Sequence, residues 1–267
     1  MMPISTLNRT HVQYTQLDPM TWCATAQVSE CLSIDFQNLR NTSLWSVINP
    51  LSRVSFHKLY KLNWHYYLPS VILSTREIAQ HQRQLQRKGV RLLLQQLLDE
   101  LKLSDILDES NFPYRLIGSK YYVCFSHTGT KTHNDMNKDS VQTINTSSKS
   151  KVTVVISQHR PIGIDIETNH LPWHVAQRFF SEHEMAALQA LSPLQRKIIA
   201  KLLWQIKESF IKIYQYKLAQ GLGIDYSYLI ADLIHIIREP LPLTVIADAK
   251  SDYRIAVLSV QQTIVIF

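Results

Sequence analysis

The sequence is poor in cysteine and has no long hydrophobic run. Its three cysteines, Cys23, Cys31 and Cys124, are odd in number and lack paired metal-ligand spacing. This usage fits a reducing cytoplasm better than secretion. Apolar runs such as 92–94 and 234–237 end far short of the roughly 20 residues that span a bilayer. The N-terminal residues contain no apolar signal core, so we expect a cytoplasmic protein without a membrane segment.

A tract of lysine and arginine is missing too, although the chain is basic. Its 28 basic and 21 acidic residues give a formal charge of +7, which argues for an anionic ligand or partner. Because the basic residues form no tract or aromatic-studded ribbon, we expect no nucleic-acid partner. A phosphate-rich small molecule or an acidic protein explains the charge equally well. The 267 residues are 45% hydrophobic, which is enough for one large domain or two small ones.

The segment Pro-Ile-Gly-Ile-Asp-Ile-Glu at 161–167 alternates strictly and predicts a strand. The isoleucines face one side, and Gly163, Asp165 and Glu167 face the other. The two carboxylates are then about 7 Å apart, which is unfavourable unless a cation, a proton or a basic side chain lies between them. A hard divalent metal ion is the natural candidate. The glycine leaves room for a large group against the backbone.

Two long helices are predicted, each after a capping box of the Ser-x-x-Glu type. The first begins near Ser74 and runs to about Leu101, with Arg83, Arg87 and Arg91 on one polar stripe.

The second helical region opens at Ser181 and continues as a long helix over 194–217. Lys201, Glu208 and Lys212 share one of its faces, because offsets of seven and four residues are near-whole helical turns.

Strands account for most of the remainder. Residues 11–17, 21–29, 121–126 and 152–156 are read as strands, as are four segments in the C-terminal part, 226–237, 243–247, 254–260 and 263–267. We expect 152–156 to form a hairpin with the strand at 161–167. The low-complexity segment of about 130–151 is expected to be a mobile insertion, and the aromatic cluster within 45–67 to be core packing.

The layout of a capped helix onset followed by a long helix recurs after about a hundred residues. We therefore expect an α+β protein of two similar, pseudo-duplicated α/β halves, 1–157 and 158–267. Each half would be a long helix packed on an antiparallel sheet.

The motif Gly-Ile-Asp-Ile-Glu at 163–167, followed by Trp-Gln-Ile-Lys-Glu-Ser-Phe-Ile-Lys at 204–212, resembles the signature of the phosphopantetheinyl transferase superfamily. Its closest likeness is to the larger, surfactin-synthetase-activating (Sfp-like) type, in which two similar halves lie in one chain. Pro113 and the Ser-His-Thr-Gly run at 126–129 fall on further motifs of the family. The resemblance extends from about Leu73 to the C-terminus.

This resemblance implies transfer of 4′-phosphopantetheine from coenzyme A to a serine of an acyl, peptidyl or aryl carrier protein, with release of adenosine 3′,5′-bisphosphate. The active site would lie between the halves. Asp165, Glu167 and Glu208 would hold Mg²⁺, and Lys212 would offset charge on the pyrophosphate and could protonate the leaving phosphate. Glu208 is also the candidate base for the carrier serine. The sequence leaves open whether it ligates the metal, accepts the proton or does both.

The resemblance further implies that Ser126, His127 and Arg91, together with Lys212, contact coenzyme A. Phe112 stands where the family has a basic residue, and Cys124 stands where it often has asparagine. Arg115 or Lys120 are candidates to supply the missing charge. The partner would be an acidic carrier protein, and two halves in one chain favour a monomer.

Other interpretations stay open. The carboxylates at 165 and 167 could protect an edge strand against aggregation, and Glu208 with Lys212 could be a surface ion pair. The chain could also be another Mg²⁺-dependent phosphoryl-transfer enzyme, or an inactive homologue that binds coenzyme A or the carrier. Turnover of a nucleotide without a carrier would indicate another phosphoryl-transfer enzyme. Binding of coenzyme A or the carrier without transfer would indicate an inactive homologue.

Overall fold

The computed structural model describes residues 5–32, 75–129 and 150–267. Three predictions lie outside these residues: the cap at Ser74, the aromatic cluster within 45–67, and all but the last two residues of the insertion. Those two, Ser150 and Lys151, belong to a strand, so the insertion is shorter at this end than predicted.

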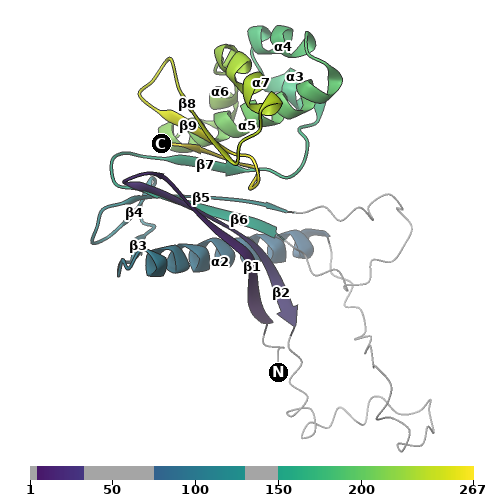
Figure 1. Ribbon diagram of the computed structural model, residues 1–267. Helices are drawn as coiled ribbons and strands as arrows, with labels where there is room; N and C mark the ends of the chain where they lie inside the picture. Colours follow the sequence, from purple (N-terminus) through teal and green to yellow (C-terminus); the bar gives the residue numbers. More distant parts are fainter. Residues whose placement is uncertain (1–4, 33–74, 130–149) are drawn as a thin grey trace, which may run out of the picture.

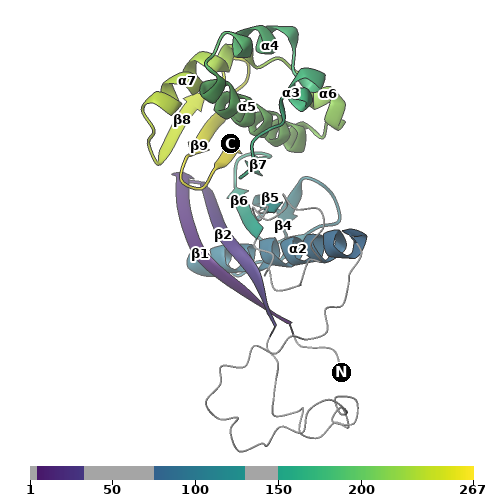
Figure 2. The same ribbon diagram turned by 90° about the vertical axis from the view of Figure 1, so that its right-hand side faces the viewer.

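The N-terminal sheet has six antiparallel strands in the order β1-β2-β6-β5-β4-β3. Its members are β1 (Ser5–Asp18), β2 (Thr21–Leu32), β3 (Leu107–Asp108), β4 (Tyr114–Leu116), β5 (Tyr122–Gly129) and β6 (Ser150–Ser157). The long helix α2 (Thr75–Glu100) packs on one face of this sheet, as Figures 1 and 2 show. The strands and the helix predicted for this part are confirmed.

The C-terminal sheet has four antiparallel strands in the order β7-β10-β9-β8. They are β7 (Gly163–Ile166), β8 (Leu243–Ala247), β9 (Arg254–Leu258) and β10 (Thr263–Ile266). The helices that accompany it are α3 (Trp173–Phe179), α4 (Glu182–Gln189), α5 (Pro193–Tyr214), α6 (Leu218–Leu222), the 3₁₀ turn η3 (Ser227–Leu229) and α7 (Ile230–Arg238). The chain is thus an α+β protein. Among the described residues, no helix is both long and apolar enough to cross a bilayer.

Local sequence signals explain where the C-terminal helices start and stop. Ser181 accepts from the backbone N–H of Glu184, whose carboxylate accepts in return from the backbone N–H of Ser181, so the predicted capping box is confirmed. Pro193 occupies the first turn of α5, where a missing N–H costs nothing. The helix ends at Gln215, which is in the left-handed conformation with φ 57°.

The two sheets face one another across a shared apolar layer. Cys23, Cys124 and Val155 of the N-terminal sheet cluster there with Ile164 and Val265 of the C-terminal sheet. Each sheet has a second apolar layer on the side of its own long helix. The two sheets share one pairing rule. In each, the strand that is last along the chain pairs with the strand that precedes the long helix: β6 pairs with β2 in the N-terminal sheet, and β10 pairs with β7 in the C-terminal sheet. Strand β7 therefore lies at the junction of the two sheets, against β5 (Figure 1).

Three sequence expectations are wrong. Strands β6 and β7 do not form a hairpin, because β7 pairs with β10 in the other sheet. Residues 230–238 are helix α7 rather than strand, since the buried side chains Ile230, Leu233 and Ile236 recur every three residues on one face. The run of 126–129 lies within β5 rather than beyond its end.

Candidate active site

The carboxylates of β7 point toward the hydroxyl groups of β5. Ser126 Oγ donates to Asp165 Oδ1 at 2.8 Å, and Thr128 Oγ1 donates to Glu167 Oε1 at 3.1 Å. Alternate side chains of a strand point to the same face, so Ser126 and Thr128 of β5 face the carboxylates at 165 and 167 together. Asp165 is only 8% exposed, and Glu167, just after the strand, is half-buried. The acidic pair predicted from the alternation therefore lies between the two sheets.

Gly163 is needed for contact with helix α5 rather than with a ligand. A Cβ atom added at this position would lie 2.1 Å from the backbone oxygen of Ser209. The large group that the glycine admits is therefore the backbone of the helix that carries Glu208 and Lys212.

Three side chains of α5 hold the backbone of β7 and of the residue that follows it, Glu167. Lys212 Nζ donates to the carbonyl of Ile164 at 2.6 Å, Gln205 Nε2 donates to that of Asp165 at 3.3 Å, and Lys201 Nζ reaches that of Glu167 at 3.5 Å. Strand and helix are thereby fixed relative to each other, so the acidic pair and the α5 side chains form one unit.

Lys212 provides the positive charge at this site. Its ammonium group lies 3.2 Å from Asp165 Oδ1. Burial alone would lower the pKa of Lys212, but the charges of Asp165 and Glu208 and the hydrogen bond to Asp165 outweigh burial and raise the pKa. Lys212 therefore stays protonated at neutral pH.

Glu208 lies one helical turn before Lys212 on α5 and is half-buried. Burial raises the pKa of Glu208, the charges of Asp165 and Glu167 raise it further, and Lys212 lowers it. The structure therefore brings Asp165, Glu167 and Lys212 within electrostatic range of Glu208. A carboxylate whose pKa is raised is a better proton acceptor than an ordinary one.

His127 and Ser126 lie on opposite faces of β5. Ser126 faces β7, whereas the neighbouring Phe125 packs with the α2 core, so His127 points to the α2 side. Its side chain reaches solvent, although neighbouring atoms remove part of its hydration. This desolvation, together with the positive charges of Lys212 and Arg87, lowers the pKa of His127. His127 is thus within electrostatic range of both Arg87 and Lys212.

Arg91 is engaged with an acidic residue of its own half. Its Nε donates to Glu109 Oε2 at 3.2 Å, its Nη2 bonds the other oxygen of the same carboxylate, and Nη1 donates to the carbonyl of Arg87. Among the described contacts, none joins Arg91 to the acidic site. A phosphate bound at Arg91 would have to replace or join Glu109.

Phe112, which the resemblance aligns with a basic residue of the family, lies near the end of α5. Gln215 Nε2 donates to the carbonyl of Phe112 at 3.0 Å, and the ring of Phe112 packs edge-on against Tyr114. The candidate substitute Arg115 stacks on the ring of Tyr122, 4.2 Å from its centroid, and donates to the hydroxyl of that ring. Arg115 is therefore already engaged with an aromatic neighbour.

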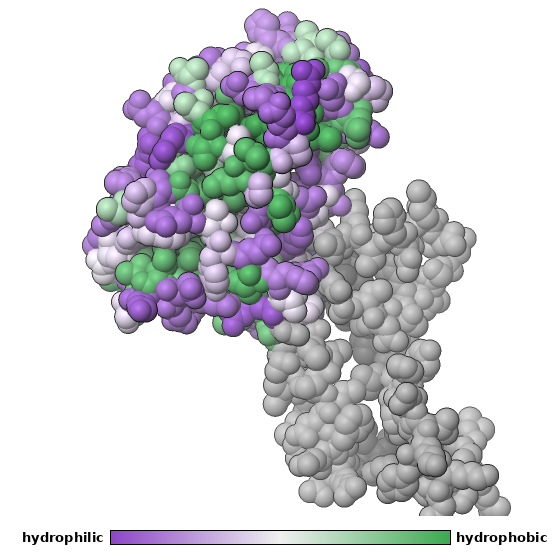
Figure 3. Space-filling view, viewed as in Figure 1, coloured by the Kyte–Doolittle hydropathy of each residue, from purple (hydrophilic) through white to green (hydrophobic). Residues whose placement is uncertain are grey.

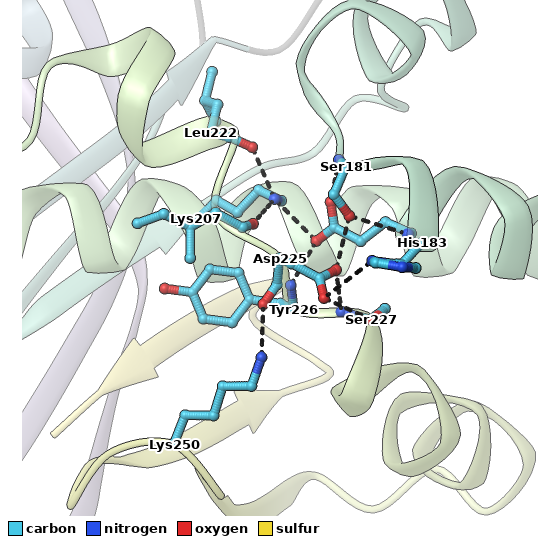
Figure 4. Close-up of polar contacts among 10 residues, drawn as sticks. Ser181, His183, Lys207, Leu222, Asp225, Tyr226, Ser227 and Lys250 are labelled. Atoms are coloured by element: carbon cyan, nitrogen blue, oxygen red, sulfur yellow. Dashed lines mark hydrogen bonds and ion pairs between the residues drawn. The ribbon is translucent and has the colours of Figure 1, made fainter.

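A second polar cluster, centred on Lys207, was not anticipated from the sequence (Figure 4). Lys207 is fully buried, and its Nζ lies 2.9 Å from Glu184 Oε1 and 2.8 Å from the carbonyl of Leu222. Its ammonium group also lies between the rings of Phe180 and Tyr226, 5.0 and 5.4 Å from their centroids. Lys207 lies within the run 204–212 that carries the family resemblance, and Glu184 within the capping box at Ser181, but no sequence pattern indicates that the two side chains pair.

The donor chemistry of the acidic site fits a hard divalent cation. In the part of the chain that the structure describes, no group of three or more His, Cys, Asp or Glu residues is arranged to hold a metal ion. However, the hydrogen bonds described for Asp165 and Glu167 use Oδ1 and Oε1, which leaves Oδ2 and Oε2 for an external ligand. Oxygen donors with mutually repelling charges are what Mg²⁺ prefers. Asp165, Glu167 and Glu208 are the residues that would hold it.

Comparison with curated proteins and with solved structures gave no match. A family model does match part of the chain, and the matched part contains the carboxylates at 165, 167 and 208 as well as Lys212. Ser126, His127 and Arg91 lie outside it. The superfamily concerned transfers phosphopantetheine to carrier proteins. Residues 161–258 thus match the model of the 4′-phosphopantetheinyl transferase superfamily.

Proposed function

We propose that this protein transfers 4′-phosphopantetheine from coenzyme A to a serine hydroxyl of an acyl, peptidyl or aryl carrier protein, with release of adenosine 3′,5′-bisphosphate. The observation that carries the proposal is the joint placement of Asp165, Glu208 and Lys212 within the matched segment 161–258. We further propose that the protein is of the larger type, with halves 1–157 and 158–267 related by internal duplication. Such a chain would work as a monomer.

Each group at the site has a distinct task in this reaction. Glu208, with its raised pKa, accepts the proton of the carrier serine. Lys212 stays protonated, offsets the charge of the pyrophosphate and can donate a proton to the leaving phosphate. Attack on the β-phosphorus needs positioning and charge neutralisation, so no protein nucleophile is required. A bound Mg²⁺ would add Lewis-acid stabilisation of the phosphate oxygens.

The neighbouring strand would serve both orientation and binding. Ser126 and Thr128 hold one oxygen of Asp165 and of Glu167, which orients the other oxygen of each toward the substrate side. We propose that Ser126 and His127 contact coenzyme A phosphates, His127 through its exposed ring. Arg91 is the proposed contact to the nucleotide end, where a phosphate would compete with Glu109.

An inactive homologue that binds coenzyme A or the carrier is the second candidate. The observation that favours it is Phe112, which lacks the charge of the family's basic residue, while Arg115 is held by Tyr122. This candidate predicts coenzyme A binding without transfer.

Intact-protein mass spectrometry tests the proposal. A panel of apo carrier proteins from fatty-acid, polyketide and nonribosomal peptide synthesis would be incubated with the protein, coenzyme A and Mg²⁺, with a parallel sample in EDTA. We expect a carrier to gain the mass of one phosphopantetheine group only when the metal is present. Coenzyme A binding without any mass gain across the panel would favour the inactive homologue. Nucleotide turnover without a carrier would indicate another phosphoryl-transfer enzyme.

A further inference from the structure

A groove lies beside the proposed active site, between helices α5 and α7 and the turn that joins β9 to β10. Its volume is about 260 Å³. Its walls are mostly apolar and include Ile198 and Leu202 of α5 and Ile237 of α7. The exposed Pro240 also lines it, so it is open to the surface. We call it the α5–α7 groove.

Large exposed apolar residues adjoin the lining of this groove. Leu241 follows the lining residue Pro240 and is 58% exposed, and Val260 follows the lining residue Ser259 and is 63% exposed. Leu194, one helical turn before the first lining residue of α5, is 68% exposed. Apolar surface on the C-terminal half is visible in Figure 3. Exposed apolar side chains that gather in one place indicate an interaction surface.

Two lysines lie where the groove meets the acidic site. Lys201 lines the groove, and its Nζ lies 3.5 Å from the carbonyl of Glu167. Lys151 Nζ donates to Oε1 of Gln262, another lining residue, at 3.3 Å. Both lysines are half-buried, and Lys201 is within electrostatic range of Lys151 and of Glu167. Two lysines against one carboxylate leave this end of the groove with a net positive charge.

This positive charge is not offset at the other end of the groove. The adjacent residues Arg238 and Glu239, next to Pro240, carry opposite charges and cancel one another. Each lysine ammonium group carries three donors. Among the described hydrogen bonds each has one acceptor, and that acceptor is uncharged. An acidic group of a partner would supply both further acceptors and the opposite charge.

Coenzyme A does not account for the two lysines. Its charged groups are the phosphates, for which Lys212 and Arg91 are the proposed contacts, and its pantetheine arm is uncharged. Arg91 belongs to α2 in the N-terminal half, whereas the groove lies in the C-terminal half. The charged part of coenzyme A would therefore extend from Lys212 away from the groove. An acidic group at Lys201 and Lys151 has to come from the other substrate, the carrier.

The carrier is also large enough to reach the groove. Its serine must approach Glu208, which lies seven residues after Lys201 on α5, about 10 Å away at about 1.5 Å per residue. A typical protein interface covers about 800 Å² on each partner, which is a disc of about 16 Å radius. A carrier with its serine at Glu208 can therefore cover the surface around Lys201.

We propose that the α5–α7 groove is a docking surface for an acidic carrier protein, an inference that rests on the proposed function. A carboxylate of the carrier pairs with Lys201 and Lys151. An apolar side chain beside that carboxylate enters the groove and contacts Leu202 and Ile237. Docking of this kind sets the affinity for the carrier and leaves the affinity for coenzyme A unchanged.

Fluorescence anisotropy of labelled apo carriers, titrated with the full chain in the absence of coenzyme A, measures docking directly. Val260→Asp and Lys201→Met should each weaken binding of the carrier about tenfold. The matched controls are Ile117→Asp, at a residue that is 53% exposed in the N-terminal half, and Lys102→Met, at an exposed lysine there. All four variants lower the net charge equally, so a difference between the pairs reports the groove rather than general steering.

A charge swap identifies the ion pair. Lys201→Glu would be titrated with carriers in which one surface Asp or Glu at a time is changed to Lys. We expect one such carrier to bind Lys201→Glu more tightly than the unchanged carrier does. In transfer assays, the KM for the carrier should rise about tenfold in Val260→Asp and Lys201→Met, and the KM for coenzyme A should not change.

Thermal melts would confirm that each variant is folded, and Lys151→Met replaces Lys201→Met if the latter is not. Wild-type affinity for the carrier in both groove variants would overturn the docking surface, while transfer by the wild type would leave the proposed function intact. Carrier binding without transfer by the wild type would contradict the proposed function, and the same variants would still decide the docking surface. A wild-type protein that binds no acidic carrier would overturn the docking surface as well.

Discussion

At the residue scale, Lys212 and Glu208 show how shared acidic neighbours shift two groups in the same direction, since the pKa of each is raised and its protonated form is favoured. The acidic neighbours that keep Lys212 protonated also make ionised Glu208 unfavourable. A raised carboxyl pKa in the folded state stabilises the fold below the unfolded-state pKa, and this stability is lost as the pH rises through the folded-state value. The site thus accepts a destabilising charge at neutral pH, which is common where a group acts as a base.

Glu208→Gln separates these two effects. The variant removes the unfavourable charge, so its melting temperature at neutral pH should equal or exceed that of the wild type. Transfer to the carrier should fall at least about 100-fold, because the base is lost. Thermal melts and intact-mass assays measure the two quantities. Wild-type transfer by Glu208→Gln would remove the residue from the reaction, and Glu239→Gln, at an exposed glutamate, is the control.

Lys207 is the residue whose removal should cost the most stability. Lys207 forms a fully buried ion pair with Glu184. Burial lowers the pKa of Lys207 and outweighs the opposing effect of the Glu184 charge. Lys207→Met leaves Glu184 charged and buried, and removing one partner of such a pair costs about 3–5 kcal/mol in free energy of unfolding. Urea denaturation measures this loss. Lys197→Met, at an exposed position of the same helix, should cost far less, and an equal loss in both variants would contradict the argument.

Packing of β7 on α5 can be tested at the scale of elements through two glycines. Gly163→Ala brings a Cβ to 2.1 Å from the Ser209 oxygen, so strand and helix must separate. We expect a loss of about 1–3 kcal/mol or more in free energy of unfolding. Gly223→Ala is the matched control, since its nearest atom would be 3.5 Å away and its φ of −80° suits alanine. Denaturant unfolding of both variants decides, and equal stability would show that β7 is not tightly held.

The loop that carries β3 and β4 depends on Asp105. Its partial burial raises the pKa, but hydrogen bonds from Ser119, Gly118 and Ile106 outweigh burial and lower the pKa of Asp105 to about 2. A lowered carboxyl pKa contributes stability above the unfolded-state value, 3.8, which is lost as the pH falls through about 2.

Asp105→Asn should therefore lower the melting temperature at about pH 6, and the difference from the wild type should shrink toward about pH 2. Thermal melts across this range measure it. Asp232→Asn, at an exposed residue of α7, is the control and should show no such trend. A difference that does not change with pH would mean that Asp105 acts without its charge.

Charge acts at the scale of the whole molecule. The formal charge of +7 should steer an acidic carrier toward the site. The kcat/KM for the carrier should fall as NaCl rises from about 0.05 to about 0.5 M, since salt screens long-range attraction. Steady-state kinetics with varied carrier measure this, and kcat at saturating carrier serves as the internal control. A kcat/KM that does not change with salt would refute steering.

Local sequence patterns specify the secondary structure around the site. Strict alternation at 163–166 specifies strand β7, and the apolar face of 193–214 with its proline start specifies helix α5. Periodicity alone misread 226–237, because a run of isoleucine and leucine suits a strand as well as a buried helix. Local patterns of this kind act over a few residues, so they describe elements well and their partners poorly.

Which elements contact one another depends on tertiary packing and could not be predicted from local patterns. Strand β7 pairs with β10 rather than β6, and the bond from Ser126 to Asp165 joins residues 39 positions apart. Gln205 Nε2 donates to the backbone carbonyls of both Asp165 and Gln262, which no spacing rule reveals. The buried partner of Lys207 likewise comes from another helix. Such contacts depend on how the sheets pack, because burial sets the cost of every unpaired polar group, and burial exists only in the folded chain.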